Sequence, residues 1–227
     1  MSTIKQMIDV RFEPAYQLSE AARYIHVPRK TVWNWFRGLS DKPVLNLASD
    51  DHQTYISFIG LAEAHVLSSM RTKHGVPLQR IRRALNHLKR EFHSEHPLVE
   101  FYFQTDGLDL FIEELGSLIN VSRYGQTGMR DVLELYLSRI ERGDDGLPIR
   151  LYPFTQNTIE TDPRIIVIDP SVSFGRPMIR RSGITTSAVT ERFKSGESIA
   201  SLADDFNRDP AEIEAAIRSE LDLLPAA

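Results

Sequence analysis

A helix confined between a proline and a glycine is the feature that most restricts how this chain can fold. Pro28 suits the first turn of a helix, where its missing N–H is not needed, and Gly38 suits the position that ends one. Because residues three and four apart share a helical face, Val32 and Trp35 should be buried while Trp33 faces outward. The chain has only two tryptophans, so the outward one needs a partner: a phosphate–sugar backbone, another subunit or a neighbouring loop.

The outer face of this helix is polar and basic. Its candidate DNA contacts are Arg29, Lys30, Thr31, Trp33, Asn34 and Arg37. The preceding stretch, 16–27, has apolar residues at helical spacing, with Ser19 as the expected N-cap. Two short helices joined by a tight turn at His26 predict a helix-turn-helix, whose second helix lies in the major groove of DNA. An ordinary helical hairpin with a solvated basic face is the alternative.

Further elements follow this unit. Residues 40–58 are polar and turn-rich, and the alternating stretch 44–47 has the size of a small two-stranded wing. Apolar residues at helical spacing then predict helices over 57–75 and 76–93. The second of these helices carries three more candidate phosphate contacts, Arg80, Arg82 and Arg83. This order of elements resembles the DNA-binding module of MerR-type regulators over about residues 16–90. The resemblance implies that Trp35 is a core residue and that Trp33 takes a position facing DNA.

The middle of the chain, 97–160, predicts a small αβ unit. Alternation over 99–103 and a turn at Thr105-Asp106-Gly107 predict a hairpin between VEFYFQ and LDLFIEE. SLINVSRYG predicts another strand, 127–143 a helix, GDDG a turn and LPIRLYPF a last strand. We expect a packing or dimerisation unit. A small-molecule pocket here, in a MerR-like transcriptional regulator, is the alternative.

The last segment has the pattern of a three-helix core. Its apolar residues at helical spacing are Val189, Phe193, Ile199, Leu202, Ala203, Phe206, Ile213, Ile217 and Leu221. The stretch 209–212 predicts a capping box with proline at the first helical position. Residues 164–222 resemble the bacterial family known as domain of unknown function 433. The resemblance rests on an apolar strand ending in Asp-Pro at 165–170, a Gly-basic-Pro-apolar-apolar stretch at 175–179, and three helices of homeodomain-like type. This sequence differs at Arg181 and Gly183, where the family often has glycine and arginine.

Charge divides the chain in two. Residues 1–93 carry a net charge of +6 and residues 94–227 a net charge of −10, so the first half suits a polyanion and the second suits a protein. Members of the family are commonly antitoxins encoded beside PIN-domain ribonuclease toxins, and the longer form looks like the VapB-type antitoxins. The resemblance implies a protein that inhibits such a ribonuclease and represses its own operon by binding double-stranded operator DNA. Because operators are usually palindromic, we expect a homodimer.

One loop of the acidic half is rich in arginine. The resemblance implies a toxin with Mg²⁺ held on clustered carboxylates, and an arginine can pair bidentately with a carboxylate. The densest cationic loop is GRPMIRRSG, so the candidate toxin contacts are Arg176, Arg180 and Arg181. The alternative is that Arg176 and Arg180 brace the acidic helices of their own domain.

Several classes of protein are disfavoured. Cysteine is absent, which excludes disulfides and thiolate sites and fits a reducing cytoplasm. No apolar run approaches the ~18 residues of a membrane span. The seven histidines are scattered, so we expect no metal site, no cofactor and no catalytic residue. We expect an α+β chain with a MerR-like winged helix-turn-helix domain at 1–96, the αβ linker or dimerisation unit at 97–160, and an antitoxin-type helix-turn-helix domain at 161–227.

Overall fold

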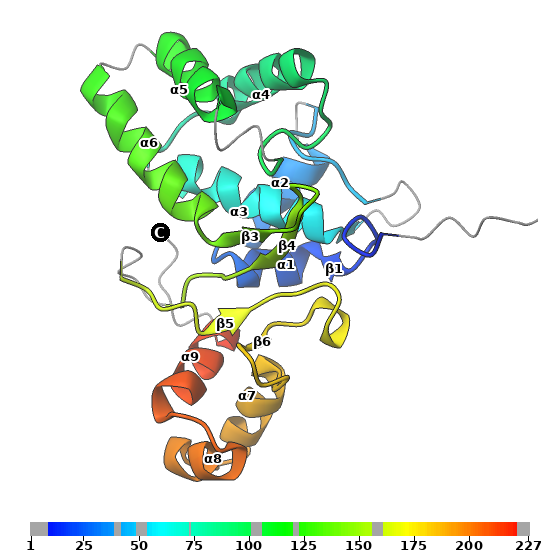
Figure 1. Cartoon of the computed structure of the whole chain (residues 1–227), viewed down its shortest axis with the longest axis vertical. Coiled ribbons are helices and arrows are strands. Elements are labelled where there is room, and N and C mark those ends of the chain that lie inside the picture. The colour runs from blue at the N-terminus through cyan, green and yellow to red at the C-terminus, as the bar shows by residue number, and fades with distance from the viewer. Residues whose placement is uncertain are drawn as a thin grey trace, which may run out of the picture.

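The structure is a computed structural model, and it describes residues 9–38, 42–48, 54–72, 74–100, 106–119, 123–155 and 161–221. It is a mixed helical and sheet fold with small antiparallel sheets. Helices α1 to α6 and strands β1 to β4 form one lobe, and helices α7 to α9 form a second lobe at the opposite end of the molecule (Figure 1). Strands β5 and β6 belong to the second lobe and lie on the side of it that faces the first (Figure 1).

The predicted first two helices are present as α1 (Leu18–Tyr24) and α2 (Arg29–Arg37). Helix α2 has the expected length and faces, because Val32, Trp35 and Phe36 are buried while Trp33 is 39% exposed. The expectation of Ser19 as N-cap was wrong. Gln17 holds that position, and its backbone N–H donates to Glu20 Oε2 at 2.9 Å, as in a capping box.

The predicted wing was also wrong in the described residues. Strand β2 (Tyr55–Ile56) pairs with β1 (Tyr16–Gln17), which precedes the first helix, and the stretch 44–47 is not a strand. The reason is that Val44 and Leu45 both donate their backbone N–H groups to the Trp35 carbonyl, at 2.8 and 3.0 Å. These residues therefore satisfy the C-terminal end of α2 and bury both side chains there.

Two long helices, α3 (Phe58–Thr72) and α4 (Leu78–Phe92), confirm the predictions over 57–75 and 76–93. Helix α3 is the centre of the first lobe and is buried along almost its whole length. Helix α4 is amphipathic, and its buried stripe consists of Ile81, Ala84, Leu85 and Leu88. Its other faces carry the arginines that the sequence singled out.

The middle unit is more helical than the sequence predicted. LDLFIEE lies within α5 (Asp106–Ile119), so the predicted strand there was wrong. The buried residues of this stretch, Leu108, Phe111, Ile112 and Leu115, have helical spacing. The strand predicted in SLINVSRYG was wrong wherever it is described, because that segment is divided between α5 and α6 (Arg123–Leu137). Residues 101–105, most of the other predicted hairpin strand, lie outside the described residues.

A hairpin closes the middle unit. The helix predicted over 127–143 ends at Leu137, and β3 (Ile140–Arg142) pairs with β4 (Pro148–Leu151) across the expected GDDG turn. The second lobe then begins with β5 (Ile166–Val167) and β6 (Met178–Ile179), which pair with each other. A bridge between Leu151 and Ile168 joins this small sheet to the β3–β4 hairpin.

The three helices of the second lobe are α7 (Thr186–Lys194), α8 (Ile199–Phe206) and α9 (Pro210–Glu220). The predicted apolar residues form their common core. Asp209 and Glu212 make the expected capping box, with Pro210 at the start of α9. Local sequence signals therefore predicted the three helices of this lobe well, because these helices have strong caps and clear apolar stripes.

A buried ion pair fixes the segment that leads into the second lobe. Arg139 Nη2 lies 2.9 Å from Asp162 Oδ2, and the two side chains are 4% and 0% exposed. Arg139 also donates from Nε to the Tyr152 carbonyl at 2.8 Å, and its guanidinium lies 4.7 Å from the Phe154 ring centroid. Asp162 accepts two more hydrogen bonds, from the backbone N–H and the hydroxyl of Thr155.

Two histidines of the first lobe complete this cluster. His26 Nε2 lies 2.9 Å from the Phe154 carbonyl oxygen, and the ring of His65 stacks on the Phe154 ring at 5.6 Å between centroids. Burial, together with the positive charge of Arg139, lowers the pKa of His65 to about 3. His65 is therefore neutral at physiological pH.

We expect Arg139→Met to destabilise the protein by about 3–5 kcal/mol, because it leaves the Asp162 carboxylate buried without its cationic partner. Urea unfolding followed by circular dichroism measures this change. The matched control is Arg130→Met, which removes a more exposed arginine that pairs with Asp109 and Glu134; it should cost less than about 1 kcal/mol. Equal losses for the two variants would contradict the assignment.

Candidate nucleic-acid and protein interfaces

Helix α2 presents the predicted basic face to solvent. Arg29 and Lys30 are exposed at its first turn, and Thr31 and Asn34 are partly exposed. The helix brings all six predicted α2 contacts within nine residues. Its positive charge and exposed polar side chains are what a helix needs to reach base edges and phosphates in a major groove.

The two tryptophans of α2 have different environments. Trp35 is buried beneath the helix, as expected. Trp33 lies on the outer face, where the Arg37 guanidinium is 5.7 Å from its ring centroid, at cation–π distance. The outward tryptophan therefore has a partner within its own helix.

The three arginines of α4 do not have the same environment. Arg83 is exposed and Arg80 is partly exposed. Arg82 Nη2 donates to the Lys42 carbonyl at 2.6 Å. Arg82 thus braces the segment that follows α2, while Arg80 and Arg83 remain in reach of solvent.

The third helix of the second lobe is positioned differently from α2. In a helix-turn-helix of this order, α9 would be the helix that reads DNA. Arg23 of α1 pairs with Glu220 of α9 at 2.9 Å, and Glu220 is buried in that contact. The more exposed part of α9 carries Glu212 and Glu214, which repel phosphates. Helix α9 therefore packs against the first lobe and offers little to a nucleic acid.

The three predicted toxin-contact arginines, Arg176, Arg180 and Arg181, are all exposed. Within the part of the chain that the structure describes, their guanidinium groups have no ion-pair or hydrogen-bond partner. The alternative, that Arg176 and Arg180 brace the acidic helices of their own domain, is therefore not what the structure shows. Arg192 braces that domain instead, between Glu197 and Asp205.

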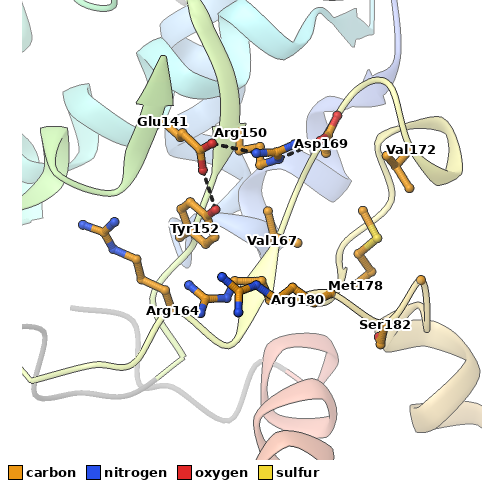
Figure 2. A pocket seen from close by; sticks show the side chains of 12 residues that line it. Glu141, Arg150, Tyr152, Arg164, Val167, Asp169, Val172, Met178, Arg180 and Ser182 are labelled. Carbon is orange, nitrogen blue, oxygen red and sulfur yellow. Dashed lines mark hydrogen bonds and ion pairs between the residues drawn. The ribbon is translucent and has the colours of Figure 1, made fainter. Parts of the chain in front are cut away.

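A cavity of about 660 Å³ lies beside two of these arginines. Arg180 and Arg181 line it together with Arg164, Val172 and residues of the β3–β4 hairpin, whereas Arg176 is not part of its wall. Figure 2 shows Arg180 below the Tyr152 ring, across the cavity from Glu141 and Arg150. The structure thus brings Arg180 and Arg181 together and leaves Arg176 on the neighbouring turn.

The opposite wall of this cavity is neutralised internally. Arg150 bridges Glu141 at 2.6 Å and Asp169 at 2.8 Å (Figure 2). The Tyr152 hydroxyl donates to Glu141 at 2.6 Å, and this bond, with the charge of Arg150, lowers the pKa of Glu141. Both carboxylates are therefore occupied, and the positive charge of Arg180 and Arg181 remains available.

The loop that departs from the family pattern has an unusual backbone. Arg181 has φ = 61° and Gly183 has φ = 73°, both in the left-handed region. Glycine adopts this region without strain, which explains why a glycine suits position 181. Here an arginine occupies position 181 and a glycine position 183, so the loop presents its cation at residue 181.

One exposed residue was missed by the sequence interpretation. Phe174 is 91% exposed and lies in a short turn, Ser173–Gly175, directly before Arg176. The signal in the sequence was an aromatic residue within the polar stretch SVSFGRP. Helical periodicity could not reveal it, because the turn has no repeating face.

The described residues contain no group of three or more His, Cys, Asp or Glu side chains arranged to hold a metal ion. In the same residues, no helix is long and apolar enough to cross a membrane.

Comparisons with known proteins match both lobes. Residues 14–85 match the family described as "Putative DNA-binding HTH domain", and residues 166–218 match "Protein of unknown function (DUF433)". The protein named "Putative antitoxin VapB45" from Mycobacterium tuberculosis H37Rv is 31% identical over 250 aligned residues, which cover 97% of this chain and 98% of that protein. The crystal structure of Rv2018 from M. tuberculosis has a TM-score of 0.68 and 26% identity, and the match covers 90% of this chain and 97% of that one.

These similarities extend over nearly the whole of both chains and include both lobes. The protein is therefore a member of the VapB45 antitoxin family, with a DNA-binding helix-turn-helix domain at its N-terminal end and a DUF433 domain at its C-terminal end.

Proposed function

We propose that this protein is the antitoxin of a type II toxin–antitoxin system, which inhibits a PIN-domain ribonuclease and represses its own operon. The observation that carries the proposal is the presence of two separate exposed cationic surfaces. One is the outer face of α2, and the other contains Arg176, Arg180 and Arg181. The second surface lies in a half with a net charge of −10, so it suits an acidic protein site better than a polyanion.

The N-terminal helix-turn-helix is the module that reads the operator in this proposal. Helix α2 is basic and exposed, whereas α9 is acidic and packs against α1 through Arg23 and Glu220. Arg29, Lys30 and Asn34 lie toward base edges, and Arg37 is held by Trp33. Arg80 and Arg83 contact phosphates, and Arg82 supports the segment after α2.

We expect the double variant Arg29→Glu/Lys30→Glu to lose at least about 100-fold in affinity for a duplex from its own promoter. Each side chain that reads a base contributes roughly 1–3 kcal/mol, and the new carboxylates repel phosphates. Fluorescence anisotropy at fixed salt concentration measures this loss.

The matched control for this variant is Lys194→Glu/Arg208→Glu, which changes the net charge equally on the second helix-turn-helix. It should retain affinity within a few-fold. Loss of binding in the control, with binding kept in the first variant, would show that the C-terminal module reads DNA.

The operator-binding form is a homodimer in this proposal, because one short helix covers only a half-site. The middle unit, 97–160, supplies the contact between subunits. Multi-angle light scattering of the chain alone should therefore give twice the monomer mass of 25.9 kDa at micromolar concentration. A stable monomer under these conditions would refute this part of the proposal.

Inhibition is assigned to the arginine loop. A guanidinium that leaves water to pair with carboxylates in the metal site of the ribonuclease blocks both the metal and the substrate phosphate. The free protein can hold these arginines at little cost because they are hydrated at the surface. In the complex, loss of one partner of such a desolvated charge pair costs about 2–5 kcal/mol.

We expect the variant Arg176→Ala/Arg180→Ala/Arg181→Ala to lose inhibition of the ribonuclease encoded by the neighbouring gene. An RNA cleavage assay measures this loss at the molar ratio at which the wild type inhibits fully. The control variant, Arg90→Ala/Arg130→Ala/Lys194→Ala, removes the same charge elsewhere and should inhibit fully. If the first variant inhibits as well as wild type, inhibition comes from another surface, such as steric cover by the acidic helices.

A second candidate function is supported by the cavity of about 660 Å³ between the hairpin and the second lobe. Its size and its arginines suit a small anionic ligand. The protein would then be a MerR-like regulator that senses such a ligand. A ribonuclease that copurifies with the chain favours the antitoxin, and a small molecule bound in this cavity favours the regulator.

A further inference from the structure

The turn that precedes Arg176 exposes an aromatic side chain. Phe174 is 91% exposed, far more than the other large exposed apolar residues of the described chain, such as Val10 at 46%. Val172, two residues earlier, is 40% exposed and borders the arginine-lined cavity. The turn therefore places an exposed apolar side chain, Phe174, on the surface that carries the exposed side chains of Arg176, Arg180 and Arg181.

The fold maintains this exposure against a backbone preference. Ser173, Phe174 and Gly175 all lie in the left-handed region, with φ values of 50°, 56° and 73°, which is unfavourable for a bulky residue such as phenylalanine. Hydrogen bonds from the Gly175 N–H to Val172 at 2.9 Å and from the Arg176 N–H to Ser173 at 3.1 Å close the turn. Packing then fixes its position, since a Cβ at Gly175 would lie 2.2 Å from the Tyr16 hydroxyl of β1.

Phe174 contributes no packing to the hydrophobic core, because its ring belongs to no buried cluster. Exposed aromatic residues next to arginines are the usual anchors of protein interfaces, where the ring fills a pocket and the charges select the partner. The neighbouring charges, Arg176, Arg180 and Arg181, have no acidic partner among the described residues. The complementary surface is therefore an apolar pocket bordered by carboxylates.

Two other occupants fit this surface less well. A second copy of the chain, related by a two-fold axis at Phe174, would bring two sets of these arginines together, because such an interface pairs the same patch on both subunits. DNA would have to approach the half of the chain that carries a net charge of −10, which repels its phosphates. The ribonuclease partner, with its carboxylates, has the charge that the arginines require.

We propose that Phe174 is the anchor by which this protein captures the ribonuclease, inserted in an apolar pocket beside the carboxylates of that enzyme. This inference rests on the proposed function and divides it into two tasks. Phe174 supplies affinity, and the adjacent arginines occupy the metal site. Loss of the ring therefore weakens the complex but leaves the capacity to inhibit at high concentration.

The test uses Phe174→Asn and Phe174→Gly in the full chain, because asparagine and glycine tolerate the left-handed conformation. Biolayer interferometry with the immobilised neighbouring ribonuclease should show at least 30-fold weaker binding for both variants, equivalent to about 2 kcal/mol. Their melting temperatures should equal or exceed that of the wild type. Val10→Asn, an equivalent change at another exposed apolar residue, should bind like the wild type.

The RNA cleavage assay separates the two tasks. At saturating concentration, the Phe174 variants should still inhibit fully, whereas Arg176→Ala/Arg180→Ala/Arg181→Ala should not. If the wild type does not bind the ribonuclease, the proposed function fails, and this inference fails with it. If the wild type binds and the Phe174 variants bind within threefold of it, only the anchor is refuted. A loss of dimer mass or of operator affinity in these variants would likewise refute it, by showing a second copy or DNA on this surface.

Discussion

The buried pair of Arg139 and Asp162 is the interaction on which the arrangement of the two lobes depends. Burying a charged group away from water costs free energy. For each of these two groups, the opposite charge and backbone hydrogen bonds offset that cost. Arg139 holds Tyr152 and Asp162 holds Thr155, so the pair fixes the chain on both sides of Phe154. Phe154 in turn contacts His26 and His65 of the first lobe. The chain therefore enters the second lobe in one defined direction, although the sheets that join the lobes are only a few residues long.

This arrangement separates two kinds of electrostatic surface. The first lobe keeps the basic face of α2 in solvent, and the second lobe covers its own third helix by packing it against α1. Helix α9 carries Glu212 and Glu214 and contacts α1 through the ion pair between Arg23 and Glu220, so it offers little to a nucleic acid.

Short-range rules predicted the parts of the fold that have strong local signals. Helix α2 between Pro28 and Gly38, and the start of α9 at the capping box of Asp209, were predicted to within a residue or two. The middle unit was not, because an alternating pattern over 99–103 was extended into a stretch whose buried residues have helical spacing. The exposed arginines could be named from the sequence, since charge density in a loop is visible there. Phe174 could not, because its exposure depends on long-range packing between Gly175 and Tyr16.

That contact has an evolutionary consequence. Gly175 belongs to the second lobe and Tyr16 to the first strand of the chain, yet no side chain fits between them. A larger residue at position 175 would need both a smaller residue at position 16 and a left-handed backbone that favours glycine, because φ is 73° there. Substitution at position 175 should therefore be rare among relatives, and any that occurs should accompany a smaller side chain at position 16.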